Sequence, residues 1–278
     1  MLFRSYYTEQ RRSLRPTTYR RLHQNDWVTA ESTFLTPELW DACVDPAHRP
    51  LLPSKDDAEF VAVDVGLKSD NAAVVRVRVR ENRIVLAGYR LWKPTKAEPL
   101  NLEETIETYL REVRVQNWVR RILIDPWQAA RSIQTLKATG LPIEEFPQTV
   151  ANTTRMAQAL YDVLKGRNLV LFEDDELRQQ ALNTVAIETP RGYRIAKEKA
   201  SRKIDAIVAL SMAIVAALDM GGRVLRAEDI FFPQDLVGAG AALDDAMVTV
   251  GSQKLDPDLA AEVRGARVSG GGWRPIGR

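Results

Sequence analysis

The pattern of hydrophobic and polar positions changes near residue 56 and again near residue 222. Residues 1–55 mix arginine, aromatic residues and proline without a sustained period, and short helices are expected only at Thr8–Leu14 and Pro37–Cys43. Beyond residue 222 the chain is rich in glycine and alanine. The sequence predicts a linker-like strap over 1–55, a folded domain over 56–222, and a flexible tail over 223–278.

The folded domain is expected to open with three strands. Glu59–Gly66 is nearly all apolar and predicts a buried strand, whereas Asn71–Arg80 alternates and predicts a half-buried antiparallel strand. After a tight turn at Glu81-Asn82, Arg83–Trp92 predicts the third strand. In the alternating strand the two faces carry Val75, Val77 and Val79 on one side and Arg76, Arg78 and Arg80 on the other.

Helices and strands alternate after this meander. Expected helices cover Leu102–Val115, Pro126 to near Gly140, Thr149–Lys165, Asp174–Ala186, and a last one that Ser201 caps and that runs to about Met220; expected strands cover Arg121–Asp125 and Ile143–Phe146, with a hairpin over Val185–Glu198. The last helix is apolar on nearly every face and is expected to be buried. The order predicts an α/β fold, a mixed sheet of antiparallel then parallel strands with helices on both faces.

Three aspartates lie within these apolar segments. Asp64 and Asp125 end the first strand and a later parallel strand, and Asp205 lies at the start of the last helix. Burying a carboxylate is costly unless something neutralises it, and ligand sites of open α/β sheets lie beyond the carboxyl ends of the strands. Without nearby histidine or cysteine, three such oxygens suit Mg²⁺ or Mn²⁺, and two ions about 4 Å apart can promote phosphodiester hydrolysis.

Each aspartate also has a structural interpretation. Asp64 can cap a turn, and Asp125 before Pro126 is a common helix start. Asp205 on an apolar helix needs a partner, which a nearby lysine or arginine can supply. The sequence leaves both interpretations open, a metal centre and three separate structural acids.

Other polar residues near these acids are weaker candidates. Asp70 can approach the metals or cap a turn, and each basic residue can either contact DNA phosphates or be solvated. The basic candidates are Lys199, Arg202 and Lys203 before the last helix, and Arg76 and Arg78 on the second strand.

Charge and composition narrow the function classes. The overall charge is +2, yet residues 1–25 carry six arginines against one acid and residues 264–278 carry four arginines and no acid, so the intervening body is acidic. Basic ends can contact a polyanion such as DNA or can simply be solvated. A single cysteine excludes an internal disulfide or a cysteine zinc cluster, and neither a secretory signal nor a membrane span is expected, which favours the cytoplasm.

Taken together, these motifs resemble the nuclease domain of the large terminase subunit of tailed bacteriophages, which has a ribonuclease H-like fold. The resemblance covers nearly residues 1–220 and depends on the order and spacing of individually weak motifs. They are Asn25-Asp-Trp27, Val61-Ala-Val-Asp-Val-Gly66 with Asp70 and Ala72-Ala-Val-Val75, Ile122-Leu-Ile-Asp-Pro126, the helix around Met156, Asn183, and Lys203-Ile-Asp-Ala-Ile-Val-Ala-Leu210.

The resemblance implies a two-metal endonuclease that cuts concatemeric viral DNA during packaging, with Asp64, Asp125 and Asp205 as ligands of two Mg²⁺ or Mn²⁺ ions. It also implies that the hairpin Val185–Glu198 lies near the active site. Implied partners are double-stranded DNA, the small terminase subunit, the portal and an ATPase motor, with no membrane, in the host cytoplasm at the procapsid.

The sequence departs from complete terminases in one respect. It contains no phosphate-binding loop of the form Gly-x-x-x-x-Gly-Lys-Ser/Thr and no dinucleotide fingerprint. Either the ATPase motor is encoded separately, or this chain is a domain excised from a longer protein. Three alternatives remain: a resolvase or transposase of the same fold, a sugar-kinase-like ATPase, and a non-catalytic docking module. The kinase alternative requires a second glycine-rich loop, and glycines are sparse between residues 67 and 220.

Overall fold

The structure is a computed structural model, and it describes residues 6–8, 10–11, 19, 23–24, 31–67, 71–189, 192–197, 199 and 202–220. All of them belong to the first of the two units into which the chain divides, Met1–Phe231 and Phe232–Arg278. Most of the helix expected at Thr8–Leu14, together with Asp70, Ser201 and the expected tail, lies outside the described residues. The division into strap, domain and tail therefore stays a prediction.

A six-stranded mixed sheet forms the centre of the fold, in the order β6-β5-β2-β3-β4-β7. Its antiparallel part joins β2 (Ala58–Asp64), β3 (Ala72–Arg80) and β4 (Arg83–Trp92), as the predicted meander requires. Three parallel pairs, β2 with β5, β5 with β6 and β4 with β7, complete the sheet and confirm the predicted mixed sheet. The parallel strands are β5 (Trp118–Ile124), β6 (Ile143–Glu145) and β7 (Leu169–Val170).

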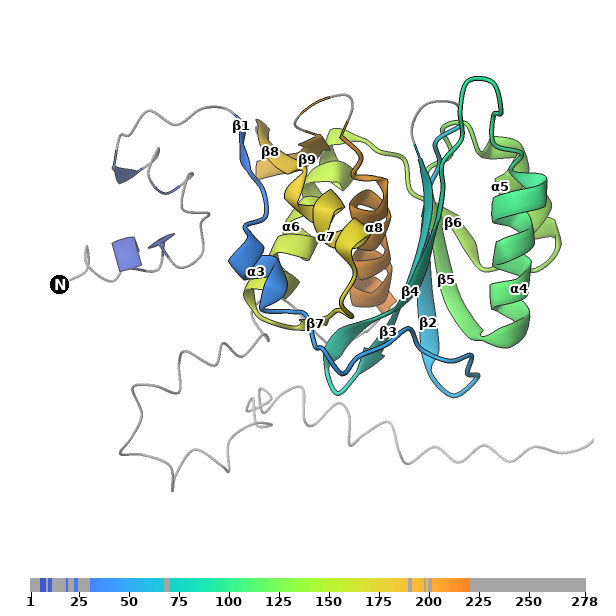
Figure 1. The fold of residues 1–278 in the computed structure, drawn as a ribbon, viewed down its shortest axis with the longest axis horizontal. Helices are drawn as coiled ribbons and strands as arrows, with labels where there is room; N and C mark the ends of the chain where they lie inside the picture. The colour runs from blue at the N-terminus through green and yellow to red at the C-terminus, as the bar shows by residue number, and fades with distance from the viewer. Residues whose placement is uncertain are drawn as a thin grey trace, which may run out of the picture. The chain divides into compact units, whose positions relative to one another are not determined.

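Helices cover both faces of this sheet (Figure 1). One face packs against α4 (Thr108–Gln116), which follows a π-helical turn at Glu103–Glu107, and α5 (Ala130–Ala138). The other face packs against α6 (Val150–Lys165) and α8 (Asp205–Met220). Since successive side chains of a strand point to opposite faces, β2 divides its apolar residues between two cores. Val61 and Val63 belong to one core, Phe60 and Ala62 to the other.

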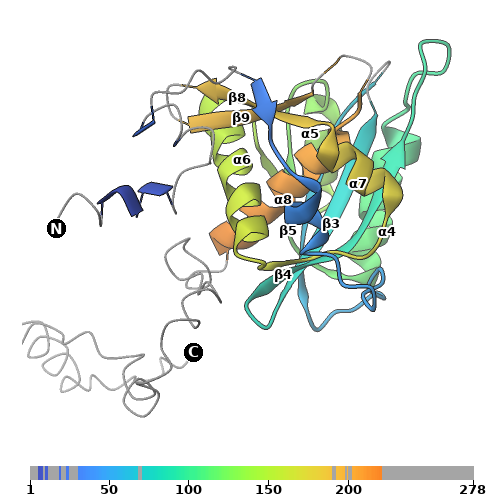
Figure 2. The ribbon, with the colours of Figure 1, turned by 60° about the vertical axis from the view of Figure 1, so that its left-hand side comes forward.

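A second, three-stranded antiparallel sheet has the order β1-β8-β9. The hairpin of β8 (Thr184–Thr189) and β9 (Gly192–Lys197) confirms the predicted one, while residues 190 and 191 at its turn lie outside the described residues. Figure 2 shows this hairpin beside α6, against which β9 packs. Its third strand, β1 (Glu31–Thr33), comes from the N-terminal segment.

The end of the N-terminal segment contributes to the core. Phe34, Leu35 and Trp40 are buried with the residues of α6 and α8, and Trp40 lies on α3 (Pro37–Asp41), a helix that the sequence predicts. Thr36 caps α3 by accepting a hydrogen bond from Leu39 N at 3.3 Å. The sequence-based expectation that this strap lies outside the core is therefore wrong for these residues. The sequence does not reveal their burial because the apolar residues after β1 are too few to form a recognisable period.

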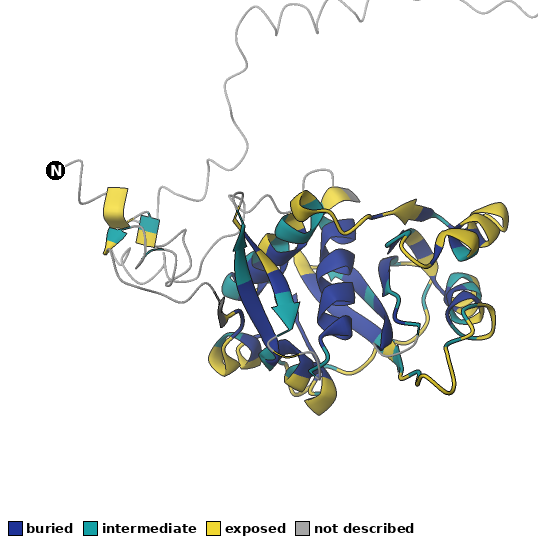
Figure 3. Ribbon diagram, turned by 90° about the horizontal axis from the view of Figure 1, so that it is seen from above, coloured by how far each residue is buried: buried dark blue, intermediate teal, exposed yellow. Residues whose placement is uncertain are grey.

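The last helix is buried along nearly its whole length, as its sequence predicts, and Figure 3 shows it as the dark blue centre of the fold. It starts later than expected, however. The Ile204 carbonyl accepts the first helical hydrogen bonds, from Ile207 N and Val208 N, so Ile204 and not Ser201 occupies the cap position. This places Asp205 at the first position of α8. Among the described residues, no helix is both long and apolar enough to span a bilayer.

Two further helix boundaries differ from the predictions. Pro126 does not open a helix, since Pro126–Ala129 forms a turn in which Gln128 has a φ of 66° and Ala129 N donates to the Pro126 carbonyl at 3.2 Å. The helix α5 begins only at Ala130. The helix α7 (Asp175–Leu182) ends four residues before the predicted end, because the chain enters β8 at Thr184.

Candidate active site

Two of the three predicted acids occupy neighbouring positions at one edge of the central sheet. Asp64 is the last residue of β2, and Asp125 directly follows β5, its parallel neighbour. The last register pair is Val63 with Ile124, so the two aspartates are the next residue on each strand. Adjacent strands lie about 4.8 Å apart, so the two carboxylates emerge side by side at the carboxyl edge.

Gln148 contacts both of these carboxylates. Its side-chain Nε2 donates a hydrogen bond to Asp64 Oδ1 at 3.3 Å, and its backbone N–H lies near enough to the Asp125 carboxylate to lower the pKa of that group. Asp125 Oδ1 also accepts a hydrogen bond from Trp127 N at 3.1 Å. The contacts of one glutamine therefore tie the ends of two strands together.

The loop between β6 and α6 places Gln148 there. Phe146 N donates to the carbonyl of Ile124 at 2.8 Å, which extends the pairing of this segment with β5 up to the residue before Asp125. Thr149 caps α6 through Asn152 N, and the Asn152 side chain donates to the Pro147 carbonyl at 2.9 Å. These bonds fix the loop on both sides of Gln148. Because β5 lies between β6 and β2, this hydrogen bond joins the segment after β6 to the end of a strand that is not its neighbour.

Asp205 lies at the end of α8 that faces the same edge of the sheet. Ala206 N donates to Gln180 Oε1 at 2.9 Å, and one turn away on α7 Glu176 forms an ion pair with Lys93 at 2.7 Å. Lys93 directly follows β4, whose last residue is paired with the first residue of β3, so it marks the Asp64 end of the sheet. In Figure 1 the chain enters α8 from the top of the view.

The opposite end of α8 is fixed elsewhere. Asp219, the next-to-last residue of the helix, accepts a hydrogen bond from Arg121 in the middle of β5 at 2.8 Å. The helix therefore runs from the carboxyl edge of β2 and β5 back along the sheet. Asp205 is itself buried, with 8% of its surface exposed.

Burial shapes the charge state of the site. Desolvation raises the pKa of Asp125 above its usual range, while the hydrogen bonds from the backbone N–H groups of Trp127 and Gln148 act in the opposite direction. Burial is the larger effect, so Asp125 holds its proton more tightly than a free aspartate does, and a bound cation would favour its ionised form. Carboxylates in such surroundings are typical of functional sites.

The donor atoms at this edge fit a hard divalent cation. Asp64 and Asp125 offer only oxygen ligands from adjacent strands, and the first turn of α8 adds a third carboxylate at the same edge. Among the residues that the structure describes, no group of three or more histidine, cysteine, aspartate or glutamate side chains is already arranged to hold a metal ion. The pair Asp64–Asp125 is therefore the defined part of the site, and Asp205 is its neighbour on α8.

Two of the three predicted basic residues before α8 contact Asn183. The Asn183 amide donates to the Lys203 carbonyl at 3.3 Å, and its Oδ1 accepts a hydrogen bond from Arg202 at 3.2 Å. Lys199 is exposed, and its carbonyl accepts a hydrogen bond from Arg202 N at 2.9 Å. Asn183, the residue before the hairpin, thus anchors the segment that leads into α8.

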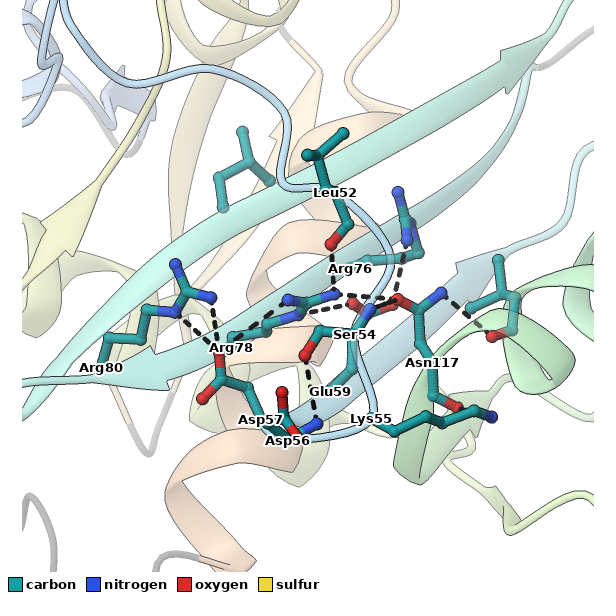
Figure 4. A network of polar contacts seen from close by, with 12 residues as sticks. Leu52, Ser54, Lys55, Asp56, Asp57, Glu59, Arg76, Arg78, Arg80 and Asn117 are labelled. Carbon is teal, nitrogen blue, oxygen red and sulfur yellow. Dashed lines mark hydrogen bonds and ion pairs between the residues drawn. The ribbon is translucent and has the colours of Figure 1, made fainter.

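The arginine face of β3 differs from the expectation. Only 1% of the Arg78 side chain is exposed, and its Nε donates to the fully buried Glu59 at 2.9 Å (Figure 4). Its Nη2 donates to Asn117 Oδ1 and to the Leu52 carbonyl at 2.9 and 3.1 Å. This burial removes Arg78 from the candidates for DNA contact, because the segment around Leu52 and the side chain of Asn117 cover the face that the alternating pattern suggests is open.

Arg76 belongs to the same buried network. Its Nη1 donates to Glu59 Oε1 at 3.1 Å, and 14% of the side chain is exposed. Its guanidinium lies against Gly88 on the paired strand, where an added Cβ would come within 2.8 Å of Arg76 Nη2. Glycine at position 88 thus leaves the space that Arg76 needs to reach Glu59, which is a structural role.

Gln148 is the site residue that the sequence analysis does not identify. A glutamine in a polar loop has no distinctive pattern of its own. The available signal is its position, two residues after the expected strand Ile143–Phe146, because residues that follow parallel strands meet at the carboxyl edge of a sheet.

Comparison with known proteins agrees with this architecture. No protein-family model matches the sequence, and no curated protein sequence matches it significantly. Among solved structures, the HK97 bacteriophage large terminase is similar over 72% of this chain, with a TM-score of 0.58 and 19% identity.

The chain has the fold of a large terminase nuclease. The large terminase nuclease of thermophilic phage G20c, solved with bound magnesium, is similar over 64% of this chain and 94% of its own, with a TM-score of 0.52 and 13% identity. The large terminase of another thermophilic bacteriophage, solved in complex with ADP, is similar over 78% of this chain, with a TM-score of 0.55 and 15% identity. The matched regions cover only 47% of the HK97 chain and 52% of the ADP-bound chain. The terminase nuclease fold confirms the predicted ribonuclease H-like sheet.

Proposed function

We propose that this chain is a metal-dependent DNA endonuclease of the large terminase type, which cuts concatemeric viral DNA into genome lengths during packaging. The observation that supports this most is the side-by-side placement of Asp64 and Asp125 at the carboxyl edge of a terminase nuclease fold, joined by Gln148. The magnesium bound to the similar G20c nuclease supports the choice of cation.

In this proposal Asp64, Asp125 and Asp205 hold two Mg²⁺ or Mn²⁺ ions. When bound, such ions supply an activated water and stabilise the leaving oxygen of a phosphodiester. The two strand carboxylates orient the cations at the edge of the sheet, and Asp205 closes the site from α8. No side chain needs to form a covalent bond to DNA.

The basic residues before α8 are proposed to hold the DNA backbone. Lys199 is exposed, and Arg202 and Lys203 are partly exposed on the segment that leads to Asp205. Phosphate contacts of this kind position a duplex without reading its sequence, so cleavage is expected to show little sequence preference. Asp70, outside the described residues, stays a proposed additional acid near the metals.

The partners are also part of the proposal. The sequence contains no phosphate-binding loop, whereas the chains of the similar HK97 and ADP-bound terminases are about twice as long as their matched regions. We infer that an ATPase motor encoded separately, or on a part of the protein outside this chain, translocates the DNA. The small terminase subunit and the portal are the other proposed partners, in the host cytoplasm at the procapsid and away from membranes.

Cleavage of supercoiled plasmid tests the proposal. The protein is expected to relax and linearise plasmid with Mg²⁺ or Mn²⁺ and to lose activity in EDTA. Asp64→Ala, Asp125→Ala and Asp205→Ala should each lower the rate by at least about 100-fold, since each removes a ligand of the catalytic ions. Asp56→Ala, which removes an exposed aspartate before β2, is the matched control and should cleave normally.

The same assay separates the alternatives. Plasmid cleavage unaffected by all three substitutions would contradict the proposed site. Exclusive cutting of one short sequence or a branched junction would favour a resolvase or transposase. ATP hydrolysis without cleavage would favour a sugar-kinase-like enzyme. A protein that folds without metal ions and shows neither activity would favour a docking module.

A further inference from the structure

The side chain of Gln148 has no evident task in holding its own loop. Other bonds already fix the backbone on both sides. Phe146 N donates to the Ile124 carbonyl, Asn152 N donates to the Thr149 side chain, and the Asn152 side chain donates to the Pro147 carbonyl. The glutamine is exposed, and such a side chain is normally able to extend into solvent. Instead it reaches across β5 and donates to a carboxylate on β2.

From this geometry we infer that Gln148 is a positioning residue for the metal site, which holds the carboxylates of Asp64 and Asp125 in a common orientation for one divalent cation. This inference rests on the proposed function. It assigns a role to a residue whose side-chain amide donates to Asp64 and whose segment is bonded to β5 at Ile124, the residue before Asp125.

The physical argument concerns two like charges at one edge. Two ionised carboxylates on adjacent strands repel each other, and each can rotate about its terminal torsion to increase their separation. A neutral donor that bonds one oxygen of Asp64 restricts this rotation without adding charge, and a carboxylate has acceptor sites enough for both such a donor and a cation. Hydrogen bonds of this kind, from a neighbour to a metal ligand, typically contribute about 10- to 100-fold to metal affinity.

The substitution Gln148→Met tests the inference. Methionine keeps the length of the side chain and removes the amide, while the backbone N–H that bonds Asp125 stays. Titration of the purified chain with Mn²⁺, followed by calorimetry, should give a Kd about 10-fold weaker than that of the unsubstituted chain. Gln148→Ala should weaken binding at least as much, and thermal unfolding in EDTA should show that both variants fold.

A matched control removes the same kind of bond elsewhere. On α6, Gln158 donates its amide to Asp162 Oδ1 at 2.7 Å, so Gln158→Met also breaks an amide-to-aspartate hydrogen bond, and Mn²⁺ affinity should not change. A double substitution provides the specific readout. In the Asp64→Ala background the acceptor that Gln148 bonds is gone, so adding Gln148→Met should leave the residual Kd unchanged.

The outcomes distinguish this inference from the function on which it rests. Unchanged or tighter Mn²⁺ binding by Gln148→Met would overturn the positioning role and leave the proposed nuclease intact. An equal loss of affinity from Gln148→Met in the unsubstituted and Asp64→Ala backgrounds would also overturn it, because the effect would not pass through Asp64. Failure of the unsubstituted chain to bind Mn²⁺ at all would overturn the proposed function itself.

Discussion

At the scale of single residues, the fold treats two of its acids differently. One buried carboxylate has charged partners, and a partly buried one, where a metal ion is proposed to bind, has none among the described residues. Glu59 is fully buried between Arg76 and Arg78, with hydrogen bonds to both guanidinium groups. Asp125 has no ion pair among the described residues and receives only backbone N–H donors, and its pKa is raised by burial. The first arrangement is expected to serve stability and the second to serve function.

Replacing Glu59 tests the structural arrangement. Glu59→Ala leaves the buried Arg78 with only the more distant Asp57 carboxylate, 3.9 Å from its Nη1, and removing one partner of a buried ion pair typically costs about 3–5 kcal/mol. Urea denaturation should show a loss of unfolding free energy in this range. The exposed pair of Glu81 and Arg83, 3.8 Å apart, is the control, and Glu81→Ala should change the free energy by less than about 1 kcal/mol. Equal effects of the two substitutions would contradict the assigned role of Glu59.

Replacing Asp125 tests the functional arrangement through pH. Because burial raises the pKa of Asp125 in the folded state, the folded protein binds this proton more tightly than the unfolded chain does. Stability therefore falls as pH rises from below the unfolded pKa to above the folded one. Asp125→Asn should unfold at a higher temperature than the unsubstituted chain at pH 7 in EDTA, and the difference should shrink as pH falls below about 4.

Added metal ions should stabilise the unsubstituted chain more than the Asp125→Asn variant. Mg²⁺ or Mn²⁺ should raise the unfolding temperature of the unsubstituted chain, since a ligand that binds only the folded state stabilises it. Asp125→Asn should lose most of this increase. Differential scanning calorimetry in EDTA and in excess Mn²⁺ checks both statements, and a metal-free Asp125→Asn that is less stable at pH 7 would contradict them.

At the scale of elements, α8 is both the centre of a core and the carrier of Asp205. Its residues pack against β2, β3 and α6, and those from Ala206 to Ala217 are all buried. Its apolar sequence therefore serves packing on every side, and the acid lies only at its first position. The position of Asp205 depends on how firmly this helix is held.

Truncating a core residue of α8 tests that dependence. Leu210 is fully buried, and Leu210→Ala should lower the unfolding free energy by about 2–5 kcal/mol because the cavity is only partly filled by relaxation. Val150→Ala at the exposed start of α6, where 55% of the valine surface is exposed, is the control and should cost less than about 1 kcal/mol. Chemical denaturation measures both, and a cost below about 1 kcal/mol for Leu210→Ala would show that α8 is not the packing centre.

The element boundaries also show which sequence patterns are informative. Periodic segments such as Thr149–Lys165 are predicted nearly to the residue, because Thr149 caps the helix and Gly166 ends it. The predicted starts of α5 and α8, at Pro126 and Ser201, are too early. Both predictions follow local cap preferences, whereas the structure uses a turn stabilised by Asp125 and a helix start at which Gln180, distant in sequence, accepts a hydrogen bond from Ala206 N.

At the scale of the whole molecule, the sequence predicts the mixed sheet. The three strands of the meander come first along the chain and the helix–strand alternation follows, and each part has its own regular hydrophobic pattern. It predicts correctly that Asp64 and Asp125 lie at the ends of two strands, because an acid at the end of an apolar run is easily recognised; their role as metal ligands stays a prediction. It does not reveal that Arg78 is buried, because the cover comes from Leu52 and Asn117, distant in sequence. Nor does it reveal Gln148, whose role depends on the order of three strands and not on any local pattern.

The pairing of β1 with β8 affects how this chain can be shortened. The prolines between residues 46 and 53 suggest a linker that can be trimmed. A protein that starts after them would lack Phe34, Leu35 and Trp40 and would leave β8 with unpaired edge groups, which promote association between copies. Recombinant versions intended for crystallography or enzymology should therefore begin upstream of Glu31.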